Sequence, residues 1–170
     1  RPPDWDSIWF MACNLRTGGY SCPPSLSHIA NAGSALIFVV AAAGLWYLKR
    51  RIEPGFPRWT FAFPLLIVFL LSNKVYSPQY SLWLLPLFAL VLPDLRLWAA
   101  FQLADIAVFV TRFRFLATLY GMPGGMSYRT LQVAVCVRAA VLIACVVVWL
   151  RRKQPVPSPE RTAVVALPEA

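Results

Sequence analysis

The sequence is poor in charged residues. Only 14% of its 170 residues are charged and 59% are hydrophobic, and the mean hydropathy is +0.60. An ordinary soluble domain contains about 25% charged residues. Stretches such as HIANAGSALIFVVAAAGLWYLKRR have no polar face for water, and an apolar run of about 20 residues can cross a hydrocarbon core about 30 Å thick. The shortage of charge therefore excludes an ordinary soluble domain and predicts an integral membrane protein.

Several other features are missing. The chain has no internal repeat and no spacing of metal ligands, and the stretch GMPGGMS lacks the Lys-Ser/Thr of a phosphate-binding loop. Because apolar runs recur along the chain, a cleaved signal peptide does not account for them. The chain begins at Arg1 rather than at methionine, so we expect a fragment or a processed product. We expect no metal and no cofactor.

The basic residues are unevenly placed. A net charge of +9 would suit a nucleic acid, but the densest basic clusters, residues 49–51 and 151–153, directly follow the first and the last apolar run. This is the positive-inside pattern that orients membrane helices. We therefore expect these clusters in the cytoplasm and no nucleic-acid partner.

The apolar runs predict an all-α fold, a polytopic transmembrane helical bundle. Residues 1–27 are expected to be an extracytoplasmic segment with an interfacial helix in WDSIWFMACNL, 28–150 the transmembrane region, and 151–170 a disordered, Pro-rich cytoplasmic tail. Residues 73–80 and 112–128 are expected to face outward as well. The five expected membrane segments are about 29–48, 59–72, 81–92, 97–111 and 130–150.

The four cysteines fall into two groups. Cys13 and Cys22 lie in the outer segment, where an oxidising milieu permits a disulfide, and both a disulfide and two free thiols fit the sequence. Cys136 and Cys145 lie in the last apolar run and are expected to be packing residues.

Two opposite charges lie within apolar segments. Asp105 is seven residues from Arg112, and Arg138 is nine from Arg129; these separations correspond to about 10 and 14 Å along antiparallel helices. A lone charge at such a depth costs several kcal/mol. We expect an ion pair between Asp105 and Arg138; the alternative is that each lines a wet cavity separately.

A polar cluster, NKVYSPQY, interrupts the apolar chain. Lys74 suits a phosphate group, and the hydroxyls and amide of Tyr76, Ser77, Gln79 and Tyr80 suit sugar oxygens. The alternative is an interfacial belt of Tyr and Lys that anchors helix ends. The flanking segments are short, about 21 Å for 14 residues, so the cluster is expected to dip below the outer surface, into a cavity lined by protein or water.

The stretch NKVYSPQYSLWLLPL resembles the signature of the family 87 glycosyltransferases of actinobacteria, in the GT-C superfamily, which include polyprenol-phosphate-mannose-dependent α-mannosyltransferases. RPPDWDSIWF resembles the outer-loop segment before a membrane helix in that family. FQLADIAVFV and YRTLQVAVCVRAA resemble its last helices. The likeness extends to about Arg152.

The resemblance implies transfer of a hexose, mannose in the named enzymes, from a polyprenyl-phosphate donor to a glycolipid or glycan acceptor of the cell envelope. The enzyme would be multi-pass in the plasma membrane and would act on the extracytoplasmic side without nucleotide or metal. The acidic base would lie upstream of Arg1, so this chain would be the C-terminal part, inactive without the missing N-terminal part. Its donor-binding residues would be Lys74, Tyr76, Ser77, Gln79 and Tyr80.

Other candidates are secondary. Asp4 and Asp6 are outside and acidic but do not match the position of the base. Arg112 and Arg114, in RFRF, suit anionic headgroups or a lipid phosphate, or a plain boundary anchor. A second class, a transporter or a non-catalytic membrane subunit, would also use the charges of Asp105 and Arg138; a transporter would predict internal repeats, which the sequence lacks.

Overall fold

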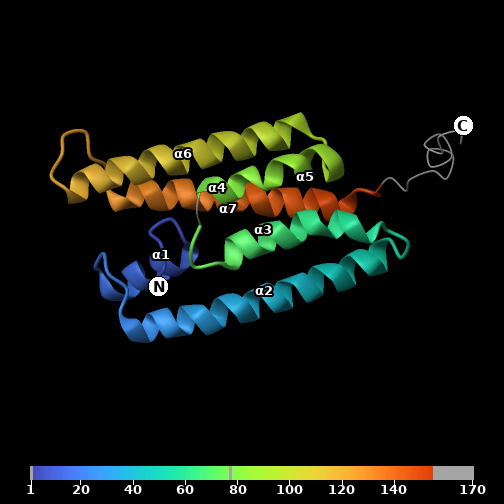
Figure 1. The fold of residues 1–170 in the computed structure, drawn as a ribbon, viewed down its shortest axis with the longest axis horizontal. Coiled ribbons are helices and arrows are strands. Elements are labelled where there is room, and N and C mark those ends of the chain that lie inside the picture. Colours follow the sequence, from blue (N-terminus) through green and yellow to red (C-terminus); the bar gives the residue numbers. More distant parts are fainter. Residues whose placement is uncertain (1, 77, 155–170) are drawn as a thin grey trace, which may run out of the picture.

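The computed structural model describes residues 2–76 and 78–154, and that part is helical with no strand (Figure 1). The prediction of an all-α fold is therefore confirmed. The three long helices are α2, α6 and α7. The elements are α1 (Ile8–Thr17), α2 (Pro24–Ile52), the 3-10 helix η1 (Arg58–Phe61), α3 (Ala62–Ser72), α4 (Pro78–Leu82), α5 (Leu84–Val91), α6 (Leu95–Leu119) and α7 (Tyr128–Arg151).

Helices α6 and α7 pack side by side and antiparallel, with α6 along one margin of the molecule and α7 between α6 and α3 (Figure 1). The start of α6 is fixed by Asp94, whose Oδ1 accepts from the backbone N–H groups of Arg96 and Leu97 at 3.1 and 3.3 Å, as an N-cap residue does. The turn after α6 uses Gly121 and Gly124 at φ 67° and 80°, a region that glycine enters without a Cβ penalty.

Helix α6 is longer than the sequence predicted. The expected segment ended near residue 111, but α6 continues through Arg112 and Arg114 to Leu119. The additional turns are held by Phe115, which is 1% exposed and lies with its ring 5.6 Å from that of Trp5 and 5.2 Å from that of Tyr128. Burial of the Phe115 ring stabilises these turns of α6 even though they contain the charged residues Arg112 and Arg114.

Helices α3, α4 and α5 form a shorter antiparallel unit that covers only part of the α6–α7 pair (Figure 1). The break between α4 and α5 falls at Trp83. Pro86 explains it, because a proline has no N–H for the carbonyl four residues earlier, here that of Leu82, and its ring crowds that carbonyl.

The connection between α3 and α4 consequently reaches the middle of the bundle. Tyr76 lies against Arg138, which is ten residues into α7, about 15 Å from its start at helical rise. Irregular backbone at such a depth is stable only where protein or water covers it. The part of the chain that covers this connection is the N-terminal segment with α1.

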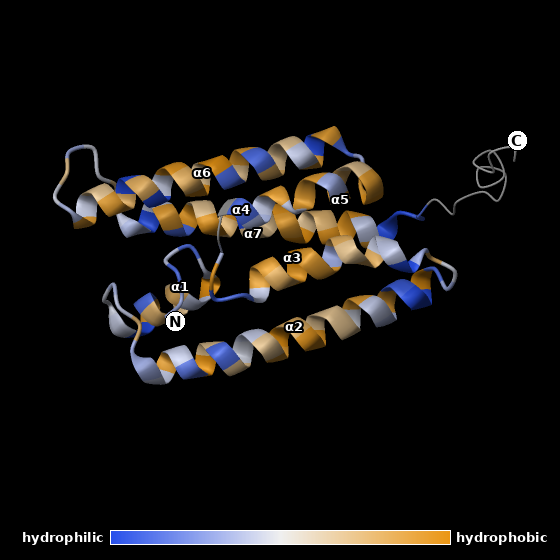
Figure 2. Ribbon diagram, in the orientation of Figure 1, coloured by the Kyte–Doolittle hydropathy of each residue, from blue (hydrophilic) through white to orange (hydrophobic). Residues whose placement is uncertain are grey.

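Helix α2 lies at the edge of the bundle, and its apolar surface is largely uncovered. Leu36, Val39 and Val40 are 65, 60 and 61% exposed, and the middle of the helix is hydrophobic while its C-terminal end is hydrophilic (Figure 2). By length and composition α2 and α7 can each cross a membrane. The remaining expected segments are shorter or carry more charge.

Two hydrophobic cores stabilise the bundle. The larger one lies among α3, α5, α6 and α7 around Phe63, Phe88, Phe101 and Trp149. The smaller one joins α1 to α6 and α7 around Phe10, Phe115, Tyr128 and Leu131. The N-terminal segment and α3–α5 thus cover different lengths of the same helix pair.

The C-terminal ends of α2 and α7 are joined through Lys49. This residue, expected in a cytoplasmic cluster, is fully buried. Its Nζ donates to the backbone carbonyls of Trp149 and Arg152 at 3.3 and 2.7 Å and pairs with Glu53 at 2.8 Å. It satisfies carbonyls that the end of α7 leaves without a helical partner.

The structure also describes part of the expected outer segment and the start of the expected tail. Cys13 and Cys22 form a disulfide, so the alternative of two free thiols does not hold in the structure. Of the expected tail, Gln154 is docked, with its backbone N–H 3.1 Å from Glu53 Oε1, while 155–170 lie outside the described residues.

Candidate functional site

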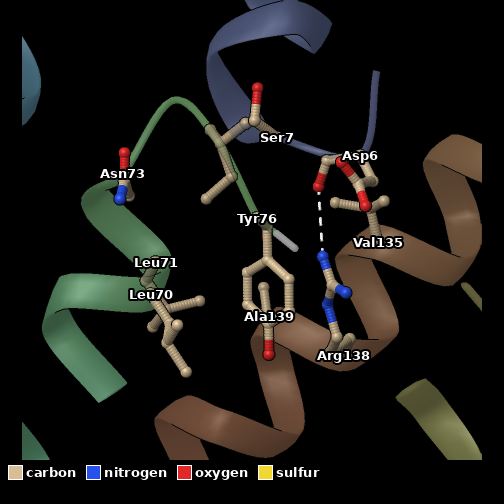
Figure 3. A pocket seen from close by; sticks show the side chains of 10 residues that line it. Asp6, Ser7, Leu70, Leu71, Asn73, Tyr76, Val135, Arg138 and Ala139 are labelled. Atoms are coloured by element: carbon tan, nitrogen blue, oxygen red, sulfur yellow. Dashed lines mark hydrogen bonds between the residues drawn. The ribbon is translucent and has the colours of Figure 1, made fainter. Parts of the chain in front are cut away.

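A buried charged cluster lies where the N-terminal segment meets α6 and α7. Arg138, 4% exposed, donates from Nη1 to Asp105 Oδ1 at 3.2 Å and from Nη2 to the backbone carbonyl of Asp6 at 3.1 Å. Its guanidinium lies 3.6 Å from the centre of the Tyr76 ring (Figure 3). The structure thus contains the expected pair of Asp105 and Arg138, and Arg138 has two additional partners that the sequence did not indicate.

Asp6 is the second acid of this cluster. Its Oδ2 accepts from Arg112 Nη1 at 2.9 Å, whereas its Oδ1 is buried and accepts no hydrogen bond from the described residues. Burial raises the pKa of the Asp6 carboxyl, against the lowering effect of the nearby Arg112 and Arg138 charges. Asp6 and Arg112, both considered for substrate contact, are used here to fasten the N-terminal segment to α6.

A small cavity lies beside these groups. Asp6, Tyr76, Arg138 and Leu70 are among its lining residues (Figure 3), and its volume is about 10 Å³. That is room for about one water molecule. A hexose does not fit.

Tyr76 is a structural residue in this arrangement. It is 3% exposed, its ring covers the Arg138 guanidinium, and its hydroxyl lies 3.2 Å from Ser81 Oγ. The expected contact of Tyr76 with donor oxygens is therefore not available in this structure, because both the ring and the hydroxyl are occupied by protein partners.

Lys74 lies in the same connection but remains half-exposed. Its backbone carbonyl accepts from the N–H of Asp4 at 2.9 Å, and its Nζ donates to Asn31 Oδ1 of α2. The neighbouring Ser72 carbonyl accepts from Trp9 Nε1 at 2.7 Å. The polar cluster is thus held between the N-terminal segment and α2.

A groove between α2 and α3 begins beside Lys74. It has a volume of about 200 Å³. Its polar lining comes from Ser34, Ser72 and Asn73, and its apolar lining from Ala35 and from the Phe38 and Phe69 rings, whose centres are 6.1 Å apart. Lys74 directly follows Asn73, and its partner Asn31 is three residues before Ser34 on α2. A cation therefore lies at the polar end of a groove with apolar walls.

The remaining predicted site residues are not brought into one place. Gln79 and Arg114 are exposed, and Tyr80 packs on Trp83 with ring centres 4.8 Å apart. Asp4 is half-buried in the N-terminal segment. Ser77 lies outside the described residues.

Sequence reasoning missed two residues beside the groove, Asn31 and Trp9. From the sequence, Asn31 was placed within an apolar run and Trp9 within the interfacial helix expected in WDSIWFMACNL. The signal for Trp9 was Gly33, because a Cβ there would lie 2.4 Å from Trp9 Cη2. The absence of a Cβ at Gly33 lets the Trp9 ring approach the backbone of α2 closely.

In the described part of the chain, no group of three or more His, Cys, Asp or Glu side chains is placed to hold a metal ion. No protein-family model, curated protein or solved structure matches this chain. The likeness to the family 87 glycosyltransferases therefore rests on the quoted sequence stretches.

Proposed function

We propose that this chain is part of a multi-pass membrane glycosyltransferase that moves a hexose from a polyprenyl-phosphate donor to an extracytoplasmic glycolipid or glycan. The observation that carries the proposal is the position of Lys74, half-exposed at the polar end of the α2–α3 groove. The sugar is mannose by resemblance. The catalytic base is assigned to a segment outside this sequence.

The chemistry of the groove supports a lipid phosphate. Phe38 and Phe69 offer an apolar wall to an isoprenoid chain, and Lys74 offers a point charge to the phosphate. During transfer, negative charge builds on the phosphate oxygen that leaves the sugar, and a fixed cation beside it lowers the barrier. Because the outer face of α2 is apolar and uncovered, the chain can enter the groove sideways from the bilayer.

The arrangement of the ends supports the five-segment topology. The N-terminal segment, Lys74, Arg112 and the start of α7 are joined by contacts such as Asp4–Lys74, Asp6–Arg112 and Trp5–Tyr128. The basic clusters at 49–51 and 151–153 meet at the C-terminal ends of α2 and α7. The segments expected outside therefore lie together, away from the segments expected in the cytoplasm.

The test measures donor binding and transfer separately. In nanodiscs, a photoreactive polyprenyl phosphate should label the wild type, and Lys74→Ala should reduce labelling, while Arg129→Ala, the same charge change on exposed surface, should not. In native membranes, Lys74→Ala should lower hexosyl transfer by at least about tenfold, or about 1.4 kcal/mol of transition-state stabilisation. Normal labelling and transfer by Lys74→Ala would favour a membrane-anchoring lysine.

A second candidate function is a transporter or a non-catalytic membrane subunit. It is favoured by the buried ion pair Asp105–Arg138, because ionisable groups inside a membrane bundle often line a transport path. Solute flux in liposomes that is lost in Asp105→Asn, together with no labelling by polyprenyl phosphate, would support this class over the transferase.

A further inference from the structure

We propose that a groove between α5 and α6 binds one acyl chain of an anionic phospholipid, with the phosphate of that lipid held at Arg96 and Arg152. The groove lies at the end opposite to Lys74, where the basic clusters meet. This inference rests on the membrane placement proposed above and is independent of glycosyl transfer.

The groove is apolar and of a size suited to a ligand. Its volume is about 420 Å³, within the range of roughly 300–1,000 Å³ of small-molecule sites. Its walls come from Leu85, Phe88 and Ala89 of α5, from Leu92 in the turn and from Trp98 of α6. Ala89 has a small, exposed side chain in the lining, so a larger side chain at this position would fill part of the groove. Hydrocarbon is the chemistry that these walls accept.

Basic residues lie near the Asp94 end of the groove. Asp94 is the acidic residue of the lining, and both of its carboxylate oxygens accept hydrogen bonds. Oδ1 accepts from the backbone N–H of Arg96 at the start of α6, and Oδ2 accepts from Arg152 Nη2 at 3.0 Å. Arg96 is exposed, and the Arg152 side chain is 48% exposed. Arg152 thus neutralises the carboxylate of the lining, and Arg96, two residues after Asp94, adds an exposed cation at the same end of α6.

The positive charge of Arg96 and Arg152 favours anionic over zwitterionic lipids. A phosphodiester without a compensating amine gains from both guanidiniums, whereas a zwitterionic headgroup brings its own cation to the same residues. Basic pockets between membrane helices on the cytoplasmic side bind anionic headgroups in this way. A second copy of the chain would bring the same basic residues against these, which opposes self-association through the groove.

The experiment uses the full chain in nanodiscs that contain equal phosphatidylglycerol and phosphatidylcholine, with retained lipids counted by native mass spectrometry. The wild type should retain phosphatidylglycerol over phosphatidylcholine. Arg96→Gln, which leaves the Asp94–Arg152 pair in place, should reduce that preference by about fivefold. Arg129→Gln, the same charge change near the other end, should leave the preference unchanged.

A second variant tests the apolar wall. Ala89→Phe fills the groove without changing charge and should lower retention of the lipid while the helical content is unchanged. Equal retention of both lipids by the wild type, retention that neither variant alters, or dimers that form through this face would overturn the proposal. If the protein is instead released from vesicles by alkaline carbonate, the membrane placement itself fails, and the two failures are thereby distinguished.

Discussion

Arg138 of α7 and Asp105 of α6 form an ion pair in the interior, with 3.2 Å between Nη1 and Oδ1. Asp105 is the eleventh of the 25 residues of α6 and Arg138 the eleventh of the 24 residues of α7, so the pair joins the two antiparallel helices near the middle of each. The same guanidinium holds the Asp6 carbonyl and covers Tyr76. One side chain thus links α7 to α6, to the N-terminal segment and to the α3–α4 connection.

Removal of Arg138 should be strongly destabilising. Arg138→Met leaves the Asp105 carboxylate buried without its cation, and loss of one partner of a buried pair costs about 3–5 kcal/mol. Thermal unfolding in detergent, followed by circular dichroism, should show a large drop in melting temperature. Arg129→Met, on exposed surface, is the control. The charge swap Asp105→Arg with Arg138→Asp should recover only part of the loss, because the aspartate cannot reproduce the bond to the Asp6 carbonyl. A mild effect of Arg138→Met would show that the pair contributes little.

Asp6 should make stability depend on pH in an unusual direction. Its pKa is raised in the folded protein above the ordinary value of 3.8, so the folded state binds the proton more tightly than the unfolded state does. The resulting stabilisation is fully present below pH 3.8 and is lost as pH rises through the folded pKa. The difference in melting temperature between the wild type and Asp6→Asn should therefore change across this window in favour of the wild type at lower pH. A constant difference would contradict the raised pKa.

Two glycines of α2 provide a matched pair. A Cβ at Gly33 would lie 2.4 Å from the Trp9 ring, whereas a Cβ at Gly44 meets nothing within 4 Å. Gly33→Ala should cost about 1–3 kcal/mol, as overpacking does, while Gly44→Ala should be neutral or stabilising by up to about 1 kcal/mol because alanine favours a helix. Chemical denaturation in detergent measures both. Trp9→Phe combined with Gly33→Ala should relieve the clash; equal behaviour of the two single variants would refute the close approach of Trp9.

The topology can be tested with single cysteines. Gly55 and Met122 are exposed in the turns at opposite ends of the bundle, and we expect the first in the cytoplasm and the second outside. In a background in which Cys136 and Cys145 are alanine, Gly55→Cys should react with an impermeant maleimide only in inverted vesicles, and Met122→Cys only in intact cells. Reaction of both from the same side would refute the five-segment topology.

The sequence predicted the features that depend on local pattern. The apolar runs predicted α2 and α7. The rise of a helix predicted similar depths for Asp105 and Arg138, because each residue's distance from the outer end is measured along one helix. Contacts between distant segments could not be obtained in this way. The pairing of Asp6 with Arg112 and the burial of Tyr76 on Arg138 depend on how the N-terminal segment enters the bundle, and no periodicity encodes that. Lys74 was identified from its residue type, whereas the groove beside it required the packing of α2 on α3.

Lys49 has a consequence for biosynthesis. Its carbonyl acceptors, Trp149 and Arg152, follow it by 100 and 103 residues. At roughly 5–20 residues per second, a ribosome needs several seconds to supply them, and until then this ammonium has only Glu53 nearby. The Glu53 partner is available as soon as α2 is made, whereas the junction of α2 and α7 closes only after translation of the final helix.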